Sequence, residues 1–100
     1  MYFITCFEKI VLNELGNLDM GCQRTFGYFD NYYDTHQALK INCCDMFETI
    51  YHYAVVEYIE PGIHSIAEAR WFYKYDREKD GYVIIEEPIE FEHYINIALG

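Results

Sequence analysis

Aromatic side chains make up 19 of the 100 residues of this chain, and their density constrains the fold more than any other feature. The chain also carries 17 acidic residues against 7 Lys and Arg, a formal net charge of −10. Chains that charge keeps unfolded are poor in aromatic residues, so we expect a folded domain with a negative surface. One hundred residues suit one core, which predicts a single domain over residues 1–100.

The negative charge narrows the classes of partner. Proteins that bind nucleic acid directly show a basic patch or stripe, and anionic membranes also attract basic segments. This sequence shows neither feature, so we expect no direct binding to nucleic acid or membrane. The partner that the charge favours is a basic protein surface or a cation, although acidity can also serve solubility alone.

The N-terminal segment and the cysteines predict a cytosolic setting. Residues 1–11 contain Glu8 and Lys9 and lack a basic start, so we expect no signal peptide, and no apolar run approaches the ~20 residues of a membrane span. Four cysteines have neither zinc-site nor redox-motif spacing: Cys6, Cys22, Cys43 and Cys44. We expect reduced thiols that pack as small apolar residues.

Alternation of aromatic and β-branched residues predicts most of the fold. Strands are expected over residues 2–10, 24–29, 48–60, 71–75 and 82–86. Both faces of 2–10 are apolar, which predicts a central strand covered on both sides. Gly27 marks a bulge, and residues 13–23 have loop chemistry.

One helix is predicted between these strands. Asn31 is a suitable N-cap, and the helix would end near Ile41. Its inward stripe is expected to contain Tyr32, Thr35, Ala38 and Leu39, and its outward polar face His36, Gln37 and Lys40. The whole pattern predicts an α+β fold: an antiparallel or mixed sheet of about five strands with one main helix packed on a face.

The run 76–87 resembles a calcium-binding EF-hand loop. Acidic residues fall at the first, third, fifth and twelfth positions: Asp76, Glu78, Asp80 and Glu87. Gly81 would supply the sharp turn. However, the flanking residues favour strands, Pro88 would fall in the exiting helix, and no second loop is present. A β-hairpin with a charged turn is the favoured prediction, and a calcium site is the alternative.

Carboxylates gather in the C-terminal quarter, where five acidic residues and no Lys or Arg follow Lys79. Apolar residues such as Ile89 and Phe91 alternate with them, a pattern typical of a docking surface for a basic partner. The predicted contact residues are Glu86, Glu87, Glu90 and Glu92, followed by Asp76, Glu78 and Asp80. The alternative is a solvated edge. From Phe91 the spacing fits a short terminal helix, and residues 94–99 fit an edge strand equally well.

Two other uses of the aromatic residues remain open. Clusters such as 71–73 could stack on a signalling nucleotide, although few cations are present to hold its phosphates, and core packing is the favoured interpretation. Strand edges rich in Tyr would also permit a homodimer. No phosphate-binding loop, nucleophile elbow or zinc motif is present, so we expect no enzyme and no metal or organic cofactor.

Several short segments together resemble small uncharacterised proteins of gut Gram-positive bacteria and their phages or mobile elements: Thr5-Cys6-Phe7-Glu8, Arg24 to Phe29, Cys44-Asp45-Met46, Pro61-Gly62-Ile63-His64 and Trp71-Phe72. The resemblance implies no catalytic or binding residue. Its implication is one of context, because small acidic proteins of mobile elements often inhibit host defence. Some occupy the nucleic-acid-binding surfaces of CRISPR effectors, and others sequester signalling nucleotides.

The sequence therefore predicts a non-enzymatic acidic protein that docks on a basic surface of a larger protein, with an anti-CRISPR-like nucleic-acid mimic as one form. The alternative function is a small-ligand binder, either a signalling-nucleotide sponge or a calcium protein.

Overall fold

The computed structural model describes residues 1–60 and 67–91. In chain order the elements are β1 (Tyr2–Phe7), β2 (Val11–Leu12), β3 (Leu18–Asp19), β4 (Gln23–Phe29), α1 (Tyr32–Lys40), η1 (Cys43–Asp45), β5 (Tyr53–Ile59), β6 (Ala67–Asp76), β7 (Gly81–Ile85) and η2 (Ile89–Phe91).

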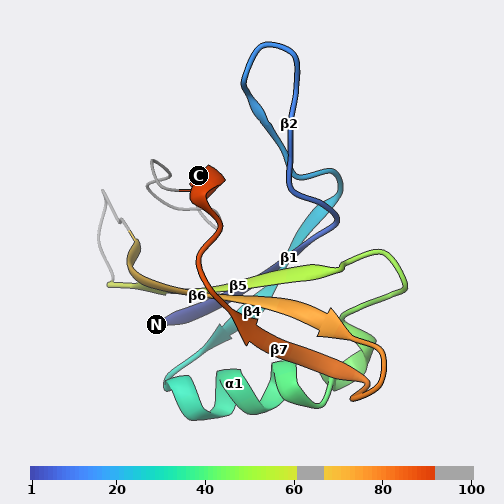
Figure 1. Ribbon diagram of the computed structural model, residues 1–100. Helices are drawn as coiled ribbons and strands as arrows, with labels where there is room; N and C mark the ends of the chain where they lie inside the picture. Colours follow the sequence, from blue (N-terminus) through green and yellow to red (C-terminus); the bar gives the residue numbers. More distant parts are fainter. Residues whose placement is uncertain (61–66, 92–100) are drawn as a thin grey trace.

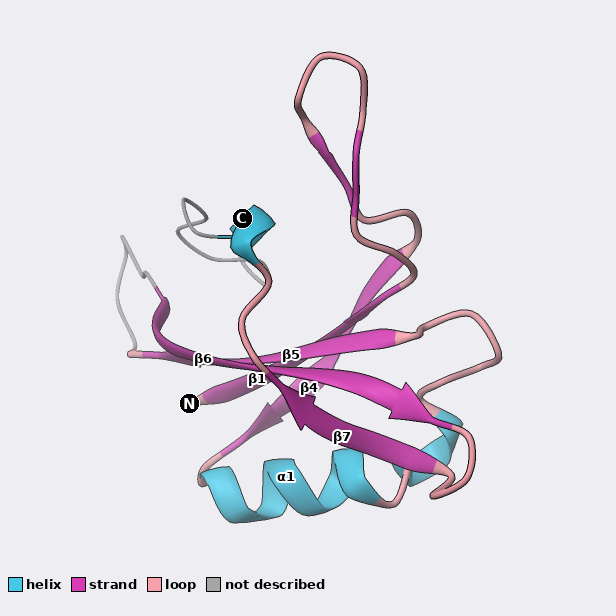
Figure 2. Cartoon of the chain, viewed as in Figure 1, coloured by secondary structure: helices cyan, strands magenta, loops and turns pink. Residues whose placement is uncertain are grey.

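The main sheet has five strands in the order β4-β1-β5-β6-β7, and every neighbouring pair is antiparallel. Helix α1 covers one face of the sheet, while η2 and the short β2–β3 hairpin lie toward the other (Figure 1, Figure 2). The predicted α+β architecture is confirmed. Strands β4 and β7 form the two edges of this sheet within the described residues.

Strand β1 is central and covered on both sides, as its two apolar faces predicted. Ile4 and Cys6 belong to the core between the sheet and α1, where Leu39 of the helix is also fully buried. Phe7 points to the opposite face and packs against Phe91 of η2, with ring centroids 5.5 Å apart. Two cores on one sheet explain how so short a chain buries many of its rings.

Helix α1 begins as the sequence predicts. The side-chain oxygen of Asn31 accepts a hydrogen bond of 2.9 Å from the backbone N–H of Asp34, and Thr35 is buried. The predicted outward position of His36 is wrong. It is half-buried, and its Nδ1 lies 2.9 Å from the hydroxyl of Tyr73 in β6, because it lies at the edge of the inward stripe.

The predicted strand over 48–60 begins five residues too early. Glu48 and Thr49 adopt left-handed backbone conformations with φ of 48° and 64°, which no strand accepts. Phe47 folds back onto the sheet and stacks on Tyr75, with ring centroids 3.8 Å apart. Burial of that ring therefore overrides the strand propensity of the residues that follow, and β6 is the longest strand instead.

Two further differences are local. The segment 13–23, predicted as a loop, contains β3, which pairs with β2. The bulge predicted at Gly27 is present: the residue has φ of 137°, and the β1–β4 register shifts beside it. The terminal helix or edge strand predicted for residues 91–99 falls, from residue 92 on, outside the described residues.

Candidate functional site

The predicted acidic residues form two separate groups rather than one surface. Asp76 ends β6, and Glu78 and Asp80 lie in the hairpin turn that follows it. Glu86 and Glu87 come after β7 at its other end, Glu90 lies in η2, and Glu92 is outside the described residues. The five residues of β7 place about 17 Å between the two groups.

Two acidic side chains of the turn accept hydrogen bonds that stabilise the turn. Asp76 accepts a hydrogen bond of 2.9 Å from the backbone N–H of Glu78, and Asp80 accepts one from the hydroxyl of Tyr75. Two cations, Arg77 and Lys79, alternate with these carboxylates. The cations therefore offset two of the three carboxylates, and the turn is less suited to docking than the C-terminal group.

Residues 76–87 form a β-hairpin and not a helix–loop–helix, so the hairpin prediction is confirmed. Asp76 and Gly81 are cross-strand partners, and Tyr82 pairs with Tyr75. The turn takes its left-handed residue from Asp80, with φ of 48°, rather than from Gly81 as an EF-hand would. Within the described residues, no three His, Cys, Asp or Glu side chains are grouped to hold a metal ion.

Gly81 is required for a different reason. A Cβ at this position would lie 1.8 Å from the backbone carbonyl oxygen of Lys40, the last residue of α1. The end of the helix therefore approaches the backbone of β7 more closely than any side chain would permit. This contact places α1 beside the edge strand.

Two of the C-terminal acids are exposed and lie near exposed apolar residues in sequence, while Glu90 is half-buried. Glu86 and Glu87 follow β7 directly, and both are solvent-exposed. Ile84 is 54% exposed and Ile89 is 79% exposed. Exposed carboxylates near exposed aliphatic side chains give this segment an amphipathic character, and its use as a docking surface stays a prediction.

The ion pairs of the described residues lie elsewhere. Lys9 pairs with Asp19, Arg24 with Glu48, and Arg70 with Glu57, at N···O distances of 3.3, 3.4 and 3.3 Å. None of these pairs uses a predicted contact residue, so among the residues that the structure describes the protein's own cations leave Glu86, Glu87 and Glu90 available.

The pair between Arg70 and Glu57 was not predicted. The Glu57 side chain is fully buried and that of Arg70 is 10% exposed, and Arg70 also donates to the carbonyl of Phe91 at 3.4 Å. The pair therefore ties β5 and β6 to η2, the element that carries Glu90. The sequence did hold a signal for this pair. Glu57 is a carboxylate on a face of residues 48–60 that otherwise holds apolar residues, and such a group requires a buried cation.

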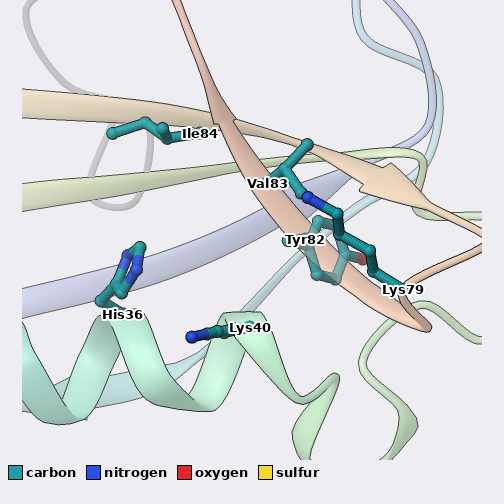
Figure 3. Close-up of a pocket in the computed structure, with 6 residues that line it drawn as sticks. All are labelled: His36, Lys40, Lys79, Tyr82, Val83 and Ile84. Atoms are coloured by element: carbon teal, nitrogen blue, oxygen red, sulfur yellow. The ribbon is translucent and has the colours of Figure 1, made fainter.

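A pocket of about 460 Å³ lies between α1 and β7 and was also missed. It is lined by His36, Lys40, Lys79, Tyr82, Val83 and Ile84. Figure 3 shows His36 and Lys40 projecting from α1, and the Lys79 side chain running from the turn alongside Tyr82 and Val83. Its lining residues lie up to 48 positions apart along the chain, and no local motif marks the site.

A hydroxyl network fixes the wall of this pocket. The Tyr73 hydroxyl contacts both Nδ1 of His36 and the hydroxyl of Tyr32, at 2.9 and 2.7 Å. Burial and the bond to Tyr32 raise the pKa of Tyr73, so its hydroxyl keeps its proton. Tyr82 donates its hydroxyl to the carbonyl of Tyr51 at 2.6 Å and presents its ring to the pocket.

The thiols divide into two kinds. Cys6 is fully buried, as predicted for a small apolar residue, and burial raises its pKa from 9.0 to about 12. Cys22 and Cys44 are exposed instead, which the prediction did not include. The Sγ atoms of Cys43 and Cys44 lie 3.7 Å apart, and that contact raises the pKa of Cys43.

No family model, curated protein or solved structure matches this chain, so its function has to be inferred from its own residues. Among the described residues, no helix has the length and apolar character needed to cross a membrane.

Proposed function

We propose that this chain is a non-catalytic binding protein that docks its C-terminal carboxylates on a basic surface of a larger protein in the cytosol of a bacterial host. The observation that carries the proposal is the position of Glu86 and Glu87. Both are exposed at the end of edge strand β7 beside exposed Ile84 and Ile89, and neither is in an ion pair within the described residues.

The surface has the two properties that a docking site needs. Unpaired carboxylates steer a basic partner toward the surface and select against acidic ones. The exposed aliphatic side chains then supply area whose burial stabilises the complex. The anchoring of η2 by Arg70 and by the buried Phe91 holds Glu90 in a defined position, which limits the ordering cost of binding.

A nucleic-acid-binding protein is the partner class that fits this charge best. Its basic groove is built to neutralise a row of phosphates, and a row of carboxylates can occupy the same groove. In line with the resemblance expected from the sequence, we propose that the partner is a defence effector that is inhibited when its groove is filled.

The test is capture from a bacterial extract with matched charge variants. We expect wild type to capture a nucleic-acid-binding protein, and the double variant Glu86→Lys/Glu87→Lys to lose it. A control, Glu14→Lys/Asp30→Lys, changes the net charge equally at exposed residues on other elements and should still capture it.

Competition and salt complete the test. Added DNA should displace this chain from the captured protein, and binding should weaken as salt rises. Equal capture by wild type and the Glu86/Glu87 variant would contradict the docking surface. Capture that survives excess DNA would contradict the nucleic-acid-mimic form of the proposal while leaving the docking surface in place.

A further inference from the structure

We propose that the pocket between α1 and β7 binds the phosphate group of a small organic molecule, with Lys40 and Lys79 as its anion contacts. This site is separate from the carboxylates that would dock a protein partner. Three of its six lining residues, His36, Lys40 and Lys79, carry nitrogen donors, and none is acidic. In a chain with 17 acidic residues and only 7 Lys and Arg, a pocket with two lysines and no carboxylate runs against the composition.

The two lysines are available to a ligand. The ion pairs of the described residues use Lys9, Arg24 and Arg70, and neither pocket lysine takes part in them. Of the two acidic residues that flank Lys79 in sequence, Asp80 accepts from the Tyr75 hydroxyl, and Glu78 is exposed and does not line the pocket. An anion bound by the two ammonium groups would therefore be the charged partner that neither lysine has within the described residues.

His36 completes the donor set. Because its Nδ1 is bonded to the buried Tyr73 hydroxyl, which in turn contacts Tyr32, its ring is held and its Nε2 is left for the pocket. When the Tyr73 hydroxyl donates to Nδ1, the proton of a neutral imidazole is on Nε2, which then donates to an anion. The hydroxyl network thus permits the tautomer that an anion requires.

The remaining walls indicate an organic ligand rather than a bare ion. The ring of Tyr82, Val83 and the half-exposed Ile84 supply apolar surface to the same pocket. A volume of about 460 Å³ falls within the range of ~300–1,000 Å³ that small-molecule sites occupy. A phosphate monoester of nucleotide size fits both features, with its phosphate at the lysines and its body over Ile84.

The helix dipole explains only part of this arrangement. A cation in the last turn of a helix is stabilised by the carbonyls there, and Lys40 is the last residue of α1. Lys79 comes from the β6–β7 turn and gains nothing from that dipole. The dipole does not explain why two lysines from separate elements line one pocket, whereas a shared anion does.

The experiment is titration of the full chain with three probes, followed by NMR chemical shifts and calorimetry: inorganic phosphate, adenosine monophosphate and adenosine. We expect saturable shifts at residues of α1 and β7 with phosphate and with the monophosphate, tighter binding of the monophosphate, and no binding of adenosine. Single variants Lys40→Gln and Lys79→Gln should each weaken binding about tenfold, the usual size of one charge-assisted contact at a partly exposed site.

The matched control is Lys74→Gln. Lys74 is an exposed lysine of β6 that lies over the ring of Tyr53, away from the pocket, and its loss changes the net charge equally. Full affinity in this variant supports a local site. Three results would each overturn the proposal. They are equal weakening by all three variants, binding of adenosine as tight as that of its monophosphate, and no saturable shift up to about 10 mM ligand.

Discussion

Replacing Gly81 by alanine should destabilise this protein although the substitution adds a single methyl group. The new Cβ would lie 1.8 Å from the Lys40 carbonyl oxygen and 2.7 Å from its carbon, so the obstacle is backbone and not a movable side chain. The end of α1 would have to retreat by about 1.2 Å before the contact relaxes to 3.0 Å. Overpacking of this kind costs about 1–3 kcal/mol.

The backbone of Gly81 adds no strain to this account. Its φ is not in the left-handed range, so alanine would otherwise gain up to about 1 kcal/mol through a less flexible unfolded chain. Because the obstacle is backbone, the overpacking cost should lie near the upper end of its range, at about 3 kcal/mol. The opposing gain of up to about 1 kcal/mol leaves an expected net loss of about 2 kcal/mol. A Tm lower by about 10 °C follows, since 1 kcal/mol moves the Tm of such a domain by ~4–8 °C.

The single tryptophan reports the movement. Trp71 packs against Tyr32 of α1 with ring centroids 4.7 Å apart, so urea unfolding followed by its fluorescence gives the free energy, and near-UV circular dichroism reports the helix position. The control is Gly16→Ala, where φ is 79° and no atom lies within 4 Å, so only backbone strain is added and the signal of the folded state should not change. A Gly81→Ala protein as stable as wild type would refute the close approach of α1 to β7.

Three further outcomes test other parts of the fold. Arg70→Met should cost about 3–5 kcal/mol in urea unfolding, because it leaves the buried Glu57 carboxylate without its cation, and adding Glu57→Met should restore most of the loss; a loss below ~1 kcal/mol would argue against the pair. Asn31→Ala should cost about 1 kcal/mol and Asn31→Gly a few tenths, with equal losses contradicting the cap. Burial raises the pKa of Cys6 from 9.0 to about 12 and also raises that of Tyr82. The unfolded chain therefore releases these protons first. The stability that protonated Cys6 contributes is present below pH 9 and is lost above it, that of Tyr82 is lost above pH 10, and each ionising group costs about 1.4 kcal/mol per pH unit; an unchanged alkaline slope in Cys6→Ala would contradict this.

The parts of the fold that sequence predicted are those fixed by local pattern. Two apolar faces over residues 2–7 are enough to make β1 central, and an Asn before a helical stripe is enough to start α1. The hairpin at residues 76–81 follows from strand-prone flanks around a polar turn. In each case the neighbours in sequence supply the interactions that decide the structure.

The parts that sequence missed depend on which distant residues meet. Phe47 stacks on Tyr75 and thereby bends a segment whose composition favours a strand. Lys40 and Lys79 both line the pocket, because the absence of a side chain at Gly81 lets the end of α1 contact β7. Composition predicted too few cations for a phosphate site, but two cations suffice when the fold brings them together.

The charge distribution connects the two proposals. Three of the seven cations are used in ion pairs, two line the pocket beside β7, and Lys74 lies over the ring of Tyr53. Little positive charge is therefore left for the C-terminal carboxylates, which lie at the opposite end of β7 from the turn. A negative net charge spread evenly would serve solubility alone. A small basic pocket lies on one side of an edge strand, and Glu86, Glu87 and Glu90 follow it without an ion pair in the described part of the chain, an arrangement that supports our proposals of one surface for a small anion and another for a basic protein.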